Sequence, residues 1–317
     1  MLVALSILCL GLYVLVLSAQ KLVNNATILG QYHHLSELMI GITIIGIGTS
    51  LPEIMVSILS AMKGSSELAL GNGYGSNIAN ILLILGASLL ICPIKIPKKL
   101  WQEELSYLSI ATIITLFVLL TGTLGRIYGF VALGIYAWMI FKSMQNQTVD
   151  ETKTPLKLPT TYQAAWCLVI FNFIVLMGSA QMLVWSATFI AHELSIGDEI
   201  IGLTVVAIGT SLPELATSIA ACKQKKTDLI LGNVIGSNLL NTLVVIGIAA
   251  CIHPIQVNLS LVYRDFALML GATLYLWFRS YTQTPKTFTR VEGIIFLLIY
   301  IGFIGMLAQH VITQNLS

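Results

Sequence analysis

The chain has few charged residues. Only 9% of its 317 residues are Asp, Glu, Lys or Arg, against ~25% in an ordinary soluble domain, while 56% are hydrophobic and the mean hydropathy is +0.89. A soluble domain of this composition would expose large apolar patches to water. The composition therefore excludes a typical soluble protein and favours helices that face lipid or one another.

Cysteine and histidine are also scarce. The chain has five cysteines, none in a CxxC pair, and five histidines, all near the ends of apolar runs. An odd number of scattered cysteines indicates neither a disulfide framework nor a zinc site, so we interpret them as packing residues. The sequence lacks an HExxH motif and a serine-histidine pair at membrane depth, so we expect a protein that is not an enzyme and needs no cofactor.

Ten apolar windows are long enough to cross ~30 Å of hydrocarbon as helices of ~20 residues. They fall near residues 2–22, 38–62, 67–92, 104–122, 126–142, 163–191, 199–222, 229–252, 262–279 and 290–312. No basic stretch precedes the first window, which we therefore interpret as a span and not as a signal peptide. The predicted fold is an all-α polytopic membrane protein with ten transmembrane helices.

The basic residues gather on one side of this predicted membrane protein. If the loops alternate between the two sides, 13 of the 16 Lys and Arg residues belong to the loops after spans 1, 3, 5, 7 and 9. The positive-inside rule places these loops in the cytoplasm and both termini on the extracytoplasmic side. We expect an integral, multi-pass protein of the plasma membrane, which is the inner membrane in a bacterium.

Two segments of the chain repeat each other. Residues 41–86 align without a gap on residues 202–247, with 21 of 46 positions identical. We divide the chain into a first five-helix repeat, 1–142, a cytoplasmic linker, 143–161, and a second five-helix repeat, 162–317. Because each repeat has an odd number of spans, the second enters the membrane from the opposite face, and such inverted repeats place a substrate site at the midplane.

Each repeated segment carries one acidic residue in mid-span, directly after a proline. These are Glu53 after Pro52 and Glu214 after Pro213, and no mid-span Lys or Arg can pair with them. A carboxylate at this depth costs ~2.5 kcal/mol or more, so it indicates a functional site. Each proline also frees backbone oxygens, which a cation, a water molecule or a neighbouring serine can satisfy. Two converging carboxylates predict one site of charge −2, which matches a divalent cation.

Neutral oxygen ligands line the helix faces that carry these glutamates. At helical spacing lie Thr49, Ser50, Ser57, Asn72, Ser76 and Asn80 in the first copy, and Thr210, Ser211, Ser218, Asn233, Ser237 and Asn241 in the second. A single serine usually bonds its own backbone, so the inference depends on the whole set. Oxygen ligands of this kind suit Ca²⁺, which takes 6 to 8 of them. The glycines of the same segments predict close helix packing: Gly71, Gly75, Gly232 and Gly236.

Two motifs occur twice, in the same order and at equal spacing. GTSLPE occupies 48–53 and 209–214, and GNxxGSNxxN occupies 71–80 and 232–241. In these motifs the chain resembles the calcium/cation antiporter superfamily, particularly its sodium/calcium exchanger branch and the related bacterial exchangers. The resemblance implies a ten-helix transporter whose ion sites surround the two glutamates.

The resemblance also implies specific ligands. Calcium would bind the carboxylates of Glu53 and Glu214 and the backbone carbonyls of Thr49 and Thr210. The implied sodium ligands, with carbonyls from the first and fourth, are Gly46, Ser50, Ser76, Ala207, Ser211 and Ser237.

The same resemblance assigns the centre of the site to Asn80 and Asn241. Many relatives, and potassium-dependent exchangers in particular, carry aspartate at the position that matches Asn241, so the amide implies a potassium-independent type. Tyr74 departs from the family pattern, because this position usually holds a small apolar residue.

The predicted function is secondary antiport of Ca²⁺ against Na⁺ by alternating access. The expected partners are Ca²⁺, Na⁺ and the lipid bilayer, with no nucleic acid and no obligate protein partner. The alternative is an antiporter of H⁺ against Ca²⁺ or another divalent cation, because desolvated carboxylates also carry protons. The many hydroxyls favour sodium, and the inverted repeat favours alternating access over a passive channel.

Overall fold

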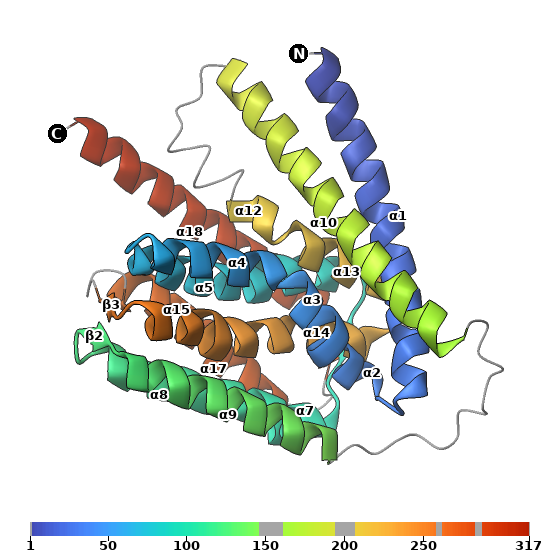
Figure 1. The fold of residues 1–317 in the computed structure, drawn as a ribbon, viewed down its shortest axis with the longest axis horizontal. Coiled ribbons are helices and arrows are strands. Elements are labelled where there is room, and N and C mark those ends of the chain that lie inside the picture. The colour runs from blue at the N-terminus through green and yellow to red at the C-terminus, as the bar shows by residue number, and fades with distance from the viewer. Residues whose placement is uncertain (1, 146–160, 194–206, 258–261, 283–286, 317) are drawn as a thin grey trace.

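The computed structural model of the chain describes residues 2–145, 161–193, 207–257, 262–282 and 287–316. Most of these residues are helical, as the apolar runs predict (Figure 1). A helix satisfies its backbone N–H and C=O groups within one segment, which is what a hydrocarbon environment requires.

The elements of the first half follow one another with short connections. They are α1 (Leu2–Tyr32), α2 (Glu37–Met39), η1 (Ile40–Ile45), α3 (Gly46–Thr49), α4 (Leu51–Met62), α5 (Ser66–Ile78), η2 (Ala79–Leu85), α6 (Gly86–Ile91), β1 (Ile94–Lys95), α7 (Lys98–Gln102), α8 (Glu104–Leu119), β2 (Thr123–Leu124) and α9 (Arg126–Gln145). The η segments are wider, π-helical turns inside longer helices. Such turns occur frequently at functional sites.

The second half repeats much of this order. It contains α10 (Tyr162–Glu193), α12 (Ala207–Thr210), α13 (Leu212–Lys223), α14 (Thr227–Leu240), η4 (Asn241–Val245), α15 (Ile246–Ile252), β3 (Ile255–Gln256), η5 (Val262–Phe266), α17 (Ala267–Thr282), β4 (Thr287–Phe288) and α18 (Arg290–Leu316). The continuous helices Ser66–Ile91 and Thr227–Ile252 are both 26 residues long and carry π-helical turns at η2 and η4.

Seven of the described helices are long and apolar enough to cross a membrane. An eighth is the pair Glu37–Thr49 and Leu51–Met62, which is bent by 45°. The window predicted at 199–222 begins outside the described residues and continues as α12 and α13. The window predicted at 262–279 is occupied by η5 and α17, which are not among the seven.

Both copies of the repeated helix break at a serine. Ser50, with φ −87° and ψ 7°, separates α3 from α4, and Ser211, with φ −90° and ψ 2°, separates α12 from α13. In each copy a proline occupies the first turn after the break. Proline tolerates that position because it has no N–H to donate and its φ is already helical. Each copy of the helix is therefore interrupted just before its glutamate.

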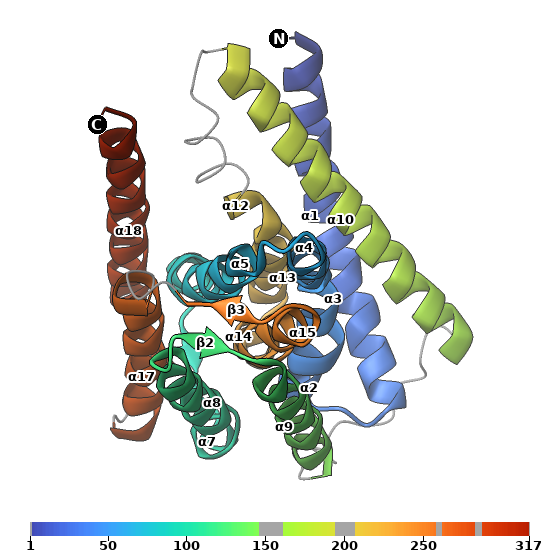
Figure 2. The ribbon, with the colours of Figure 1, turned by 60° about the vertical axis from the view of Figure 1, so that its left-hand side comes forward.

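The two longest helices, α1 and α10, pack side by side along one face of the remaining helices, and both views show them projecting beyond the others (Figures 1 and 2). α1 continues to Tyr32, well past its predicted end at residue 22. Behind this pair, α14 is the central helix, since it contacts η1, α2, α3 and α13. Nearly every residue of α14 from Leu229 to Leu240 is buried.

Short strands and one disulfide connect the ends of distant helices. β1 pairs with β4, and β2 pairs with β3, both antiparallel. Cys92, after α6, is bonded to Cys222 in α13, although 130 residues separate them. The interpretation of all five cysteines as packing residues is therefore wrong for this pair. Neither cysteine belongs to a local motif, so only the tertiary fold reveals the bond.

Backbone-to-backbone packing holds α14 against the first copy. A Cβ added at Gly232 would lie 2.1 Å from the Leu38 carbonyl oxygen, and one at Gly236 would lie 2.6 Å from Ile42 Cα. The prediction of close packing is confirmed at these two glycines. At Gly71 and Gly75, an added Cβ would meet no described atom within 4 Å.

Candidate ion-binding site

The two glutamates lie at equivalent points of two half-helices. Glu53 belongs to the first turn of α4 and Glu214 to the first turn of α13, and their side chains are 1% and 2% exposed. The N-terminal end of a helix carries a partial positive charge, which favours a carboxylate there. The proline break in mid-membrane therefore creates two helix starts, each of which supports one buried acid.

The structure brings the two copies together at these acids. The Ser50 hydroxyl, which lies at the break directly before α4, donates to Glu214 Oε1 at 3.4 Å. This bond joins the break before α4 to the first turn of α13, although Glu53 and Glu214 belong to different copies.

Each carboxylate has an oxygen with nothing bound to it. Glu53 Oε2 and Glu214 Oε2 are buried and have no hydrogen-bond partner, and the ion pairs within the described residues involve neither acid. A buried charge without a partner costs several kcal/mol. A cation between the two carboxylates would remove this cost and most of their repulsion. In the described part of the chain, no group of three or more His, Cys, Asp or Glu gathers, so the remaining ligands of such a cation would be neutral oxygens.

The predicted neutral ligands next to the break are mostly buried. Thr49, Ser50 and Ser211 are at most 2% exposed, and Thr210 is half-buried. Thr49 Oγ1 donates back to the Ile45 carbonyl at 3.0 Å, which is ordinary behaviour for threonine in a helix. Ser211 Oγ, in contrast, is buried without a partner and remains available to a ligand.

Contacts with α14 connect the two copies at the predicted sodium ligands. Ser237 Oγ donates to the Gly46 carbonyl at 3.5 Å, so both predicted ligands lie at one place. Thr49 Oγ1 lies 3.4 Å from Asn233 Oδ1. Ala207, the remaining predicted ligand, begins α12 at the edge of the described residues.

The two central asparagines differ in their partners. Asn80 Nδ2 donates to Asn238 Oδ1 at 2.9 Å and makes no recorded bond to a carboxylate. Both amide atoms of Asn241 are buried without a hydrogen-bond partner. An amide in this position costs about 1–3 kcal/mol for each unsatisfied group unless a ligand or water binds it. Of the two, Asn241 therefore has the free ligand capacity.

Four further asparagines support the site. Asn72 Nδ2 donates to the Glu53 carbonyl at 3.1 Å, and Asn233 Nδ2 donates to the Glu214 carbonyl at 3.4 Å, so each fixes the backbone of one glutamate. The sequence places both in the oxygen-bearing set but does not reveal this role.

Asn77 and Asn238 are absent from the predicted set of ligands. Asn77 Nδ2 donates to Thr242 Oγ1 at 2.9 Å, and Asn238 Nδ2 lies 3.5 Å from the Asn77 carbonyl. Both belong to the repeated GNxxGSNxxN motif, which is the signal that identifies them. Together they join α5 to α14 and η4.

Comparison with known proteins finds relatives that match almost the whole length of this chain. The sequence profile of the family described as sodium/calcium exchanger protein matches residues 3–144 and 164–309. The inner membrane protein YrbG of Escherichia coli K12 is 33% identical, over 97% of this chain and 97% of that protein. The sodium/calcium exchanger MaX1 of Methanosarcina acetivorans is 27% identical, over 95% of this chain and 97% of that protein.

A solved structure has the same fold. The sodium-calcium exchanger NCX_Mj, soaked with Na⁺ and Ca²⁺, superposes with a TM-score of 0.83 at 30% sequence identity, covering 96% of this chain and 98% of that one. The apolar helices and these matches together make the chain an integral, multi-pass membrane protein.

Proposed function

The chain belongs to the sodium/calcium exchanger protein family, and from this premise we propose that it exchanges Ca²⁺ for Na⁺ by alternating access. Membership makes it a cation antiporter, which is a transporter and not an enzyme. The observation that carries the proposal is the pair Glu53 and Glu214. Both are buried, one in each copy, and within the described residues each lacks a basic partner and has one carboxylate oxygen without a hydrogen bond.

The proposed calcium ligands are the two carboxylates and the carbonyls of Thr49 and Thr210. The proposed sodium ligands are Gly46, Ser50, Ser76, Ala207, Ser211 and Ser237, with Asn80 and Asn241 at the centre. Contacts between Ser50 and Glu214 and between Ser237 and Gly46 support this grouping. The solved NCX_Mj structures were soaked with Na⁺, Ca²⁺ or Sr²⁺, and we extend these ions to this chain by homology.

Charge explains why the two ions exchange. With both glutamates ionised the site carries −2, so one Ca²⁺ neutralises it and three Na⁺ leave it at +1. Each exchange of three Na⁺ for one Ca²⁺ would then move net charge across the membrane. Only a charge-compensated site is expected to allow the protein to change its facing direction.

The choice of sodium over protons depends on the hydroxyl groups. Ser50, Ser211 and Ser237 are all at most 2% exposed, and Ser50 donates to Glu214, whereas a proton would need no such oxygens. The amide of Asn241, in place of a carboxylate, favours exchange that does not require K⁺.

We propose ten spans in two inverted repeats, 1–142 and 162–317, joined by the cytoplasmic linker 143–161. The strand pairs support this topology, because β1 with β4 joins two predicted cytoplasmic loops, and β2 with β3 joins two predicted outer ones. Under the repeat, one pair is the counterpart of the other. The helix pairs α6 with α18 and α15 with α9 are related in the same way.

The orientation and the moving parts complete the proposal. Lysine-rich loops would face the cytoplasm, both termini the other side, and the protein would reside in the plasma membrane, the inner membrane of a bacterium. The helices α1 and α10 lie on one face of the rest and would slide across it to change the access of the site.

Flux in reconstituted vesicles tests the function. Purified protein is incorporated into liposomes, and ⁴⁵Ca²⁺ uptake is driven by an outward Na⁺ gradient, by a pH gradient without Na⁺, or by a Na⁺ gradient with K⁺ added. We expect uptake with Na⁺ alone, no stimulation by K⁺, and a membrane potential that changes the rate. The variants Glu53→Gln and Glu214→Gln should each reduce uptake to that of empty liposomes.

Glu67→Gln is the matched control, because Glu67 is an exposed acid in the first turn of α5. It should transport like the wild type. Undiminished uptake in both glutamine variants at the site would overturn the ligand assignment. Uptake driven by the pH gradient alone would replace sodium with protons as the counter-ion.

A further inference from the structure

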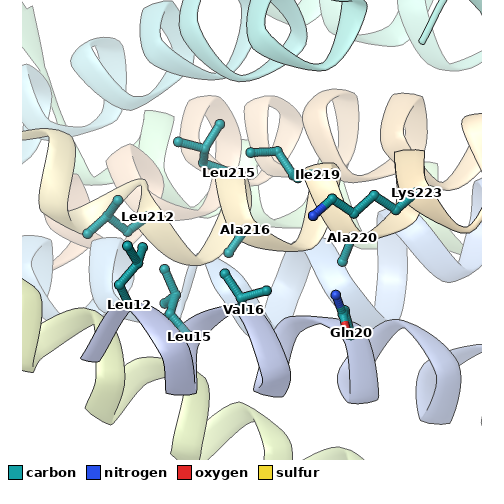
Figure 3. Close-up of a pocket in the computed structure, with 10 residues that line it drawn as sticks. All are labelled: Leu12, Leu15, Val16, Gln20, Leu212, Leu215, Ala216, Ile219, Ala220 and Lys223. Carbon is teal, nitrogen blue, oxygen red and sulfur yellow. The ribbon is translucent and has the colours of Figure 1, made fainter. Parts of the chain in front are cut away.

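An apolar groove lies between α1 and α13 (Figure 3). It encloses about 140 Å³ and extends from Leu12 and Leu212 at one end to Gln20 and Lys223 at the other. Only the second end is polar. A void of ~150 Å³ accommodates one benzene ring, so the groove can hold a section of a hydrocarbon chain but no large ligand.

The two copies differ in sequence along the groove. At three positions of the shared helix, α4 carries Met55, Leu59 and Met62 where α13 carries Ala216, Ala220 and Lys223. The two alanines are short side chains that line the groove. Longer side chains at these two positions would occupy part of its space.

Its length matches half of a membrane. From Leu212 to Lys223 the helix rises ~16 Å at 1.5 Å per residue. One leaflet contributes ~15 Å of a hydrocarbon core ~30 Å thick. Since Leu212 follows the mid-span break and Lys223 ends the span, the groove extends from the midplane to the headgroup level of one leaflet.

Lys223 supplies a charge at the headgroup end. Its side chain is exposed and has no hydrogen-bond or ion-pair partner among the described residues. In Figure 3 its side chain runs back along α13, and its ammonium group lies over Ala220, opposite Gln20. An apolar channel one leaflet deep with a free cation at its outer end is complementary to a lipid that has an anionic headgroup.

We propose that this groove binds one acyl chain of an anionic phospholipid, whose headgroup phosphate contacts Lys223. The lipid would lie at the interface that α1 must cross when it slides along α13. A ligand that binds one arrangement better than another shifts the equilibrium toward it. The lipid would therefore stabilise the arrangement in which α1 covers α13. Lipid binding here is independent of which ions are exchanged, so it can fail while the proposed function holds.

The test measures lipid retention by native mass spectrometry. Delipidated protein is incubated with phosphatidylglycerol or phosphatidylcholine that carry identical chains. We expect the wild type to retain one phosphatidylglycerol with about fivefold preference. Lys223→Met should abolish the preference, and Ala216→Met with Ala220→Leu, which restores the residues of the other copy, should abolish retention of both lipids. Lys63→Met, which removes a lysine from the end of α4, should behave like the wild type.

Three results would overturn the proposal. They are equal retention of the two lipids by the wild type, an unchanged preference in Lys223→Met, and undiminished retention in a folded, groove-filled variant. Because Lys223→Met leaves the apolar walls intact, it decides the question even if the filled variant does not fold. A stoichiometric second polypeptide that remains bound after delipidation would also overturn it, because a partner helix would then occupy the groove.

Discussion

The two copies of the broken helix contain the same chemistry in different surroundings. In each, an asparagine of the next helix donates to the carbonyl of the glutamate and to a serine one turn further on. The pairs are Asn72 with Ser57 and Asn233 with Ser218, and both bonds are 3.1 Å long. The proposed single ion site would use both glutamates, which accounts for the near symmetry of the polar layer around them.

The helices that cover the two copies are not symmetric. Leu59 on α4 is 51% exposed, whereas its counterpart Ala220 on α13 is 3% exposed. α1 packs along α13, whereas within the described residues α4 has no comparable contact with α10. The proposed alternating access would require such an inequality, because one path to the site would be covered while the other is open. In the proposed orientation the covered half-helix would be the cytoplasmic one, and the arrangement would be outward-facing.

The largest expected effect comes from removing the disulfide between Cys92 and Cys222, whose counterpart positions in the repeat are not cysteines. Under the repeat, the counterparts of Cys92 and Cys222 are His253 and Ala61. A crosslink over 130 residues stabilises a protein by about 2–4 kcal/mol. We therefore expect dithiothreitol to lower the melting temperature of the purified, oxidised protein, and Cys92→Ser to lower it equally. Dithiothreitol should have no further effect on that variant.

Cys167→Ser is the control for this prediction, since Cys167 is an exposed, free cysteine. The same pair also tests the orientation. If Cys92 and Cys222 lie on the cytoplasmic side of the membrane, we expect both thiols to be kept reduced in growing cells and to react with a permeant maleimide. A pair that is fully oxidised in cells would contradict the proposed orientation.

The next effect tests whether the polar layer is truly symmetric. Groups that orient a metal ligand from behind typically change affinity 10- to 100-fold when they are removed. Asn72→Ala and Asn233→Ala should therefore each weaken the apparent affinity for Ca²⁺ by about 10- to 100-fold, by similar factors, with a smaller effect on the maximal rate. The measurement is ⁴⁵Ca²⁺ uptake as a function of Ca²⁺ concentration.

Asn172→Ala is the matched control. Asn172 is a buried asparagine of α10 that donates to the carbonyl of Leu168 in its own helix, at 2.6 Å. Its removal should leave the affinity unchanged. Loss of affinity in only one of the two site variants would indicate that calcium binds mainly to one copy.

Local signals in the sequence were sufficient for much of the site. Glu53 and Glu214 are identifiable from their positions in mid-span alone, because a carboxylate there costs free energy. The prolines directly before them mark the places where the helices break, at Ser50 and Ser211. Spacing of three and four residues then identifies the hydroxyls and amides that share their face. Each of these properties depends on one helix, and the sequence specifies a helix locally.

Contacts between distant segments were not predictable in the same way. The Cys92–Cys222 bond and the groove between α1 and α13 depend on how whole helices pack. The roles of Asn72 and Asn233 depend on which backbone carbonyl lies opposite an amide, which a motif does not encode. The π-helical turns at η2 and η4 were not predicted either, because the periodicity of hydrophobic residues cannot distinguish a π turn from an α turn.

The smallest effect concerns the glycines, which occupy equivalent positions but have different neighbours. At Gly232 an added Cβ would lie 2.1 Å from the Leu38 carbonyl oxygen, and this backbone atom cannot move without displacing a helix. Overpacking of this kind costs about 1–3 kcal/mol. We expect Gly232→Ala to lower the melting temperature in detergent, despite the better helix propensity of alanine.

Gly71→Ala is the counterpart in the first copy, where an added Cβ meets no described atom within 4 Å. Alanine in a helix is more stable than glycine by about 0.5–1 kcal/mol, so this variant should melt at the same temperature as the wild type or slightly above it. Because both substitutions gain the same helix propensity, the difference between their melting temperatures isolates the contact of α14 with the segment around Leu38. Equal melting of the two variants would mean that these backbones do not touch, and that the copies pack alike on both sides of the site.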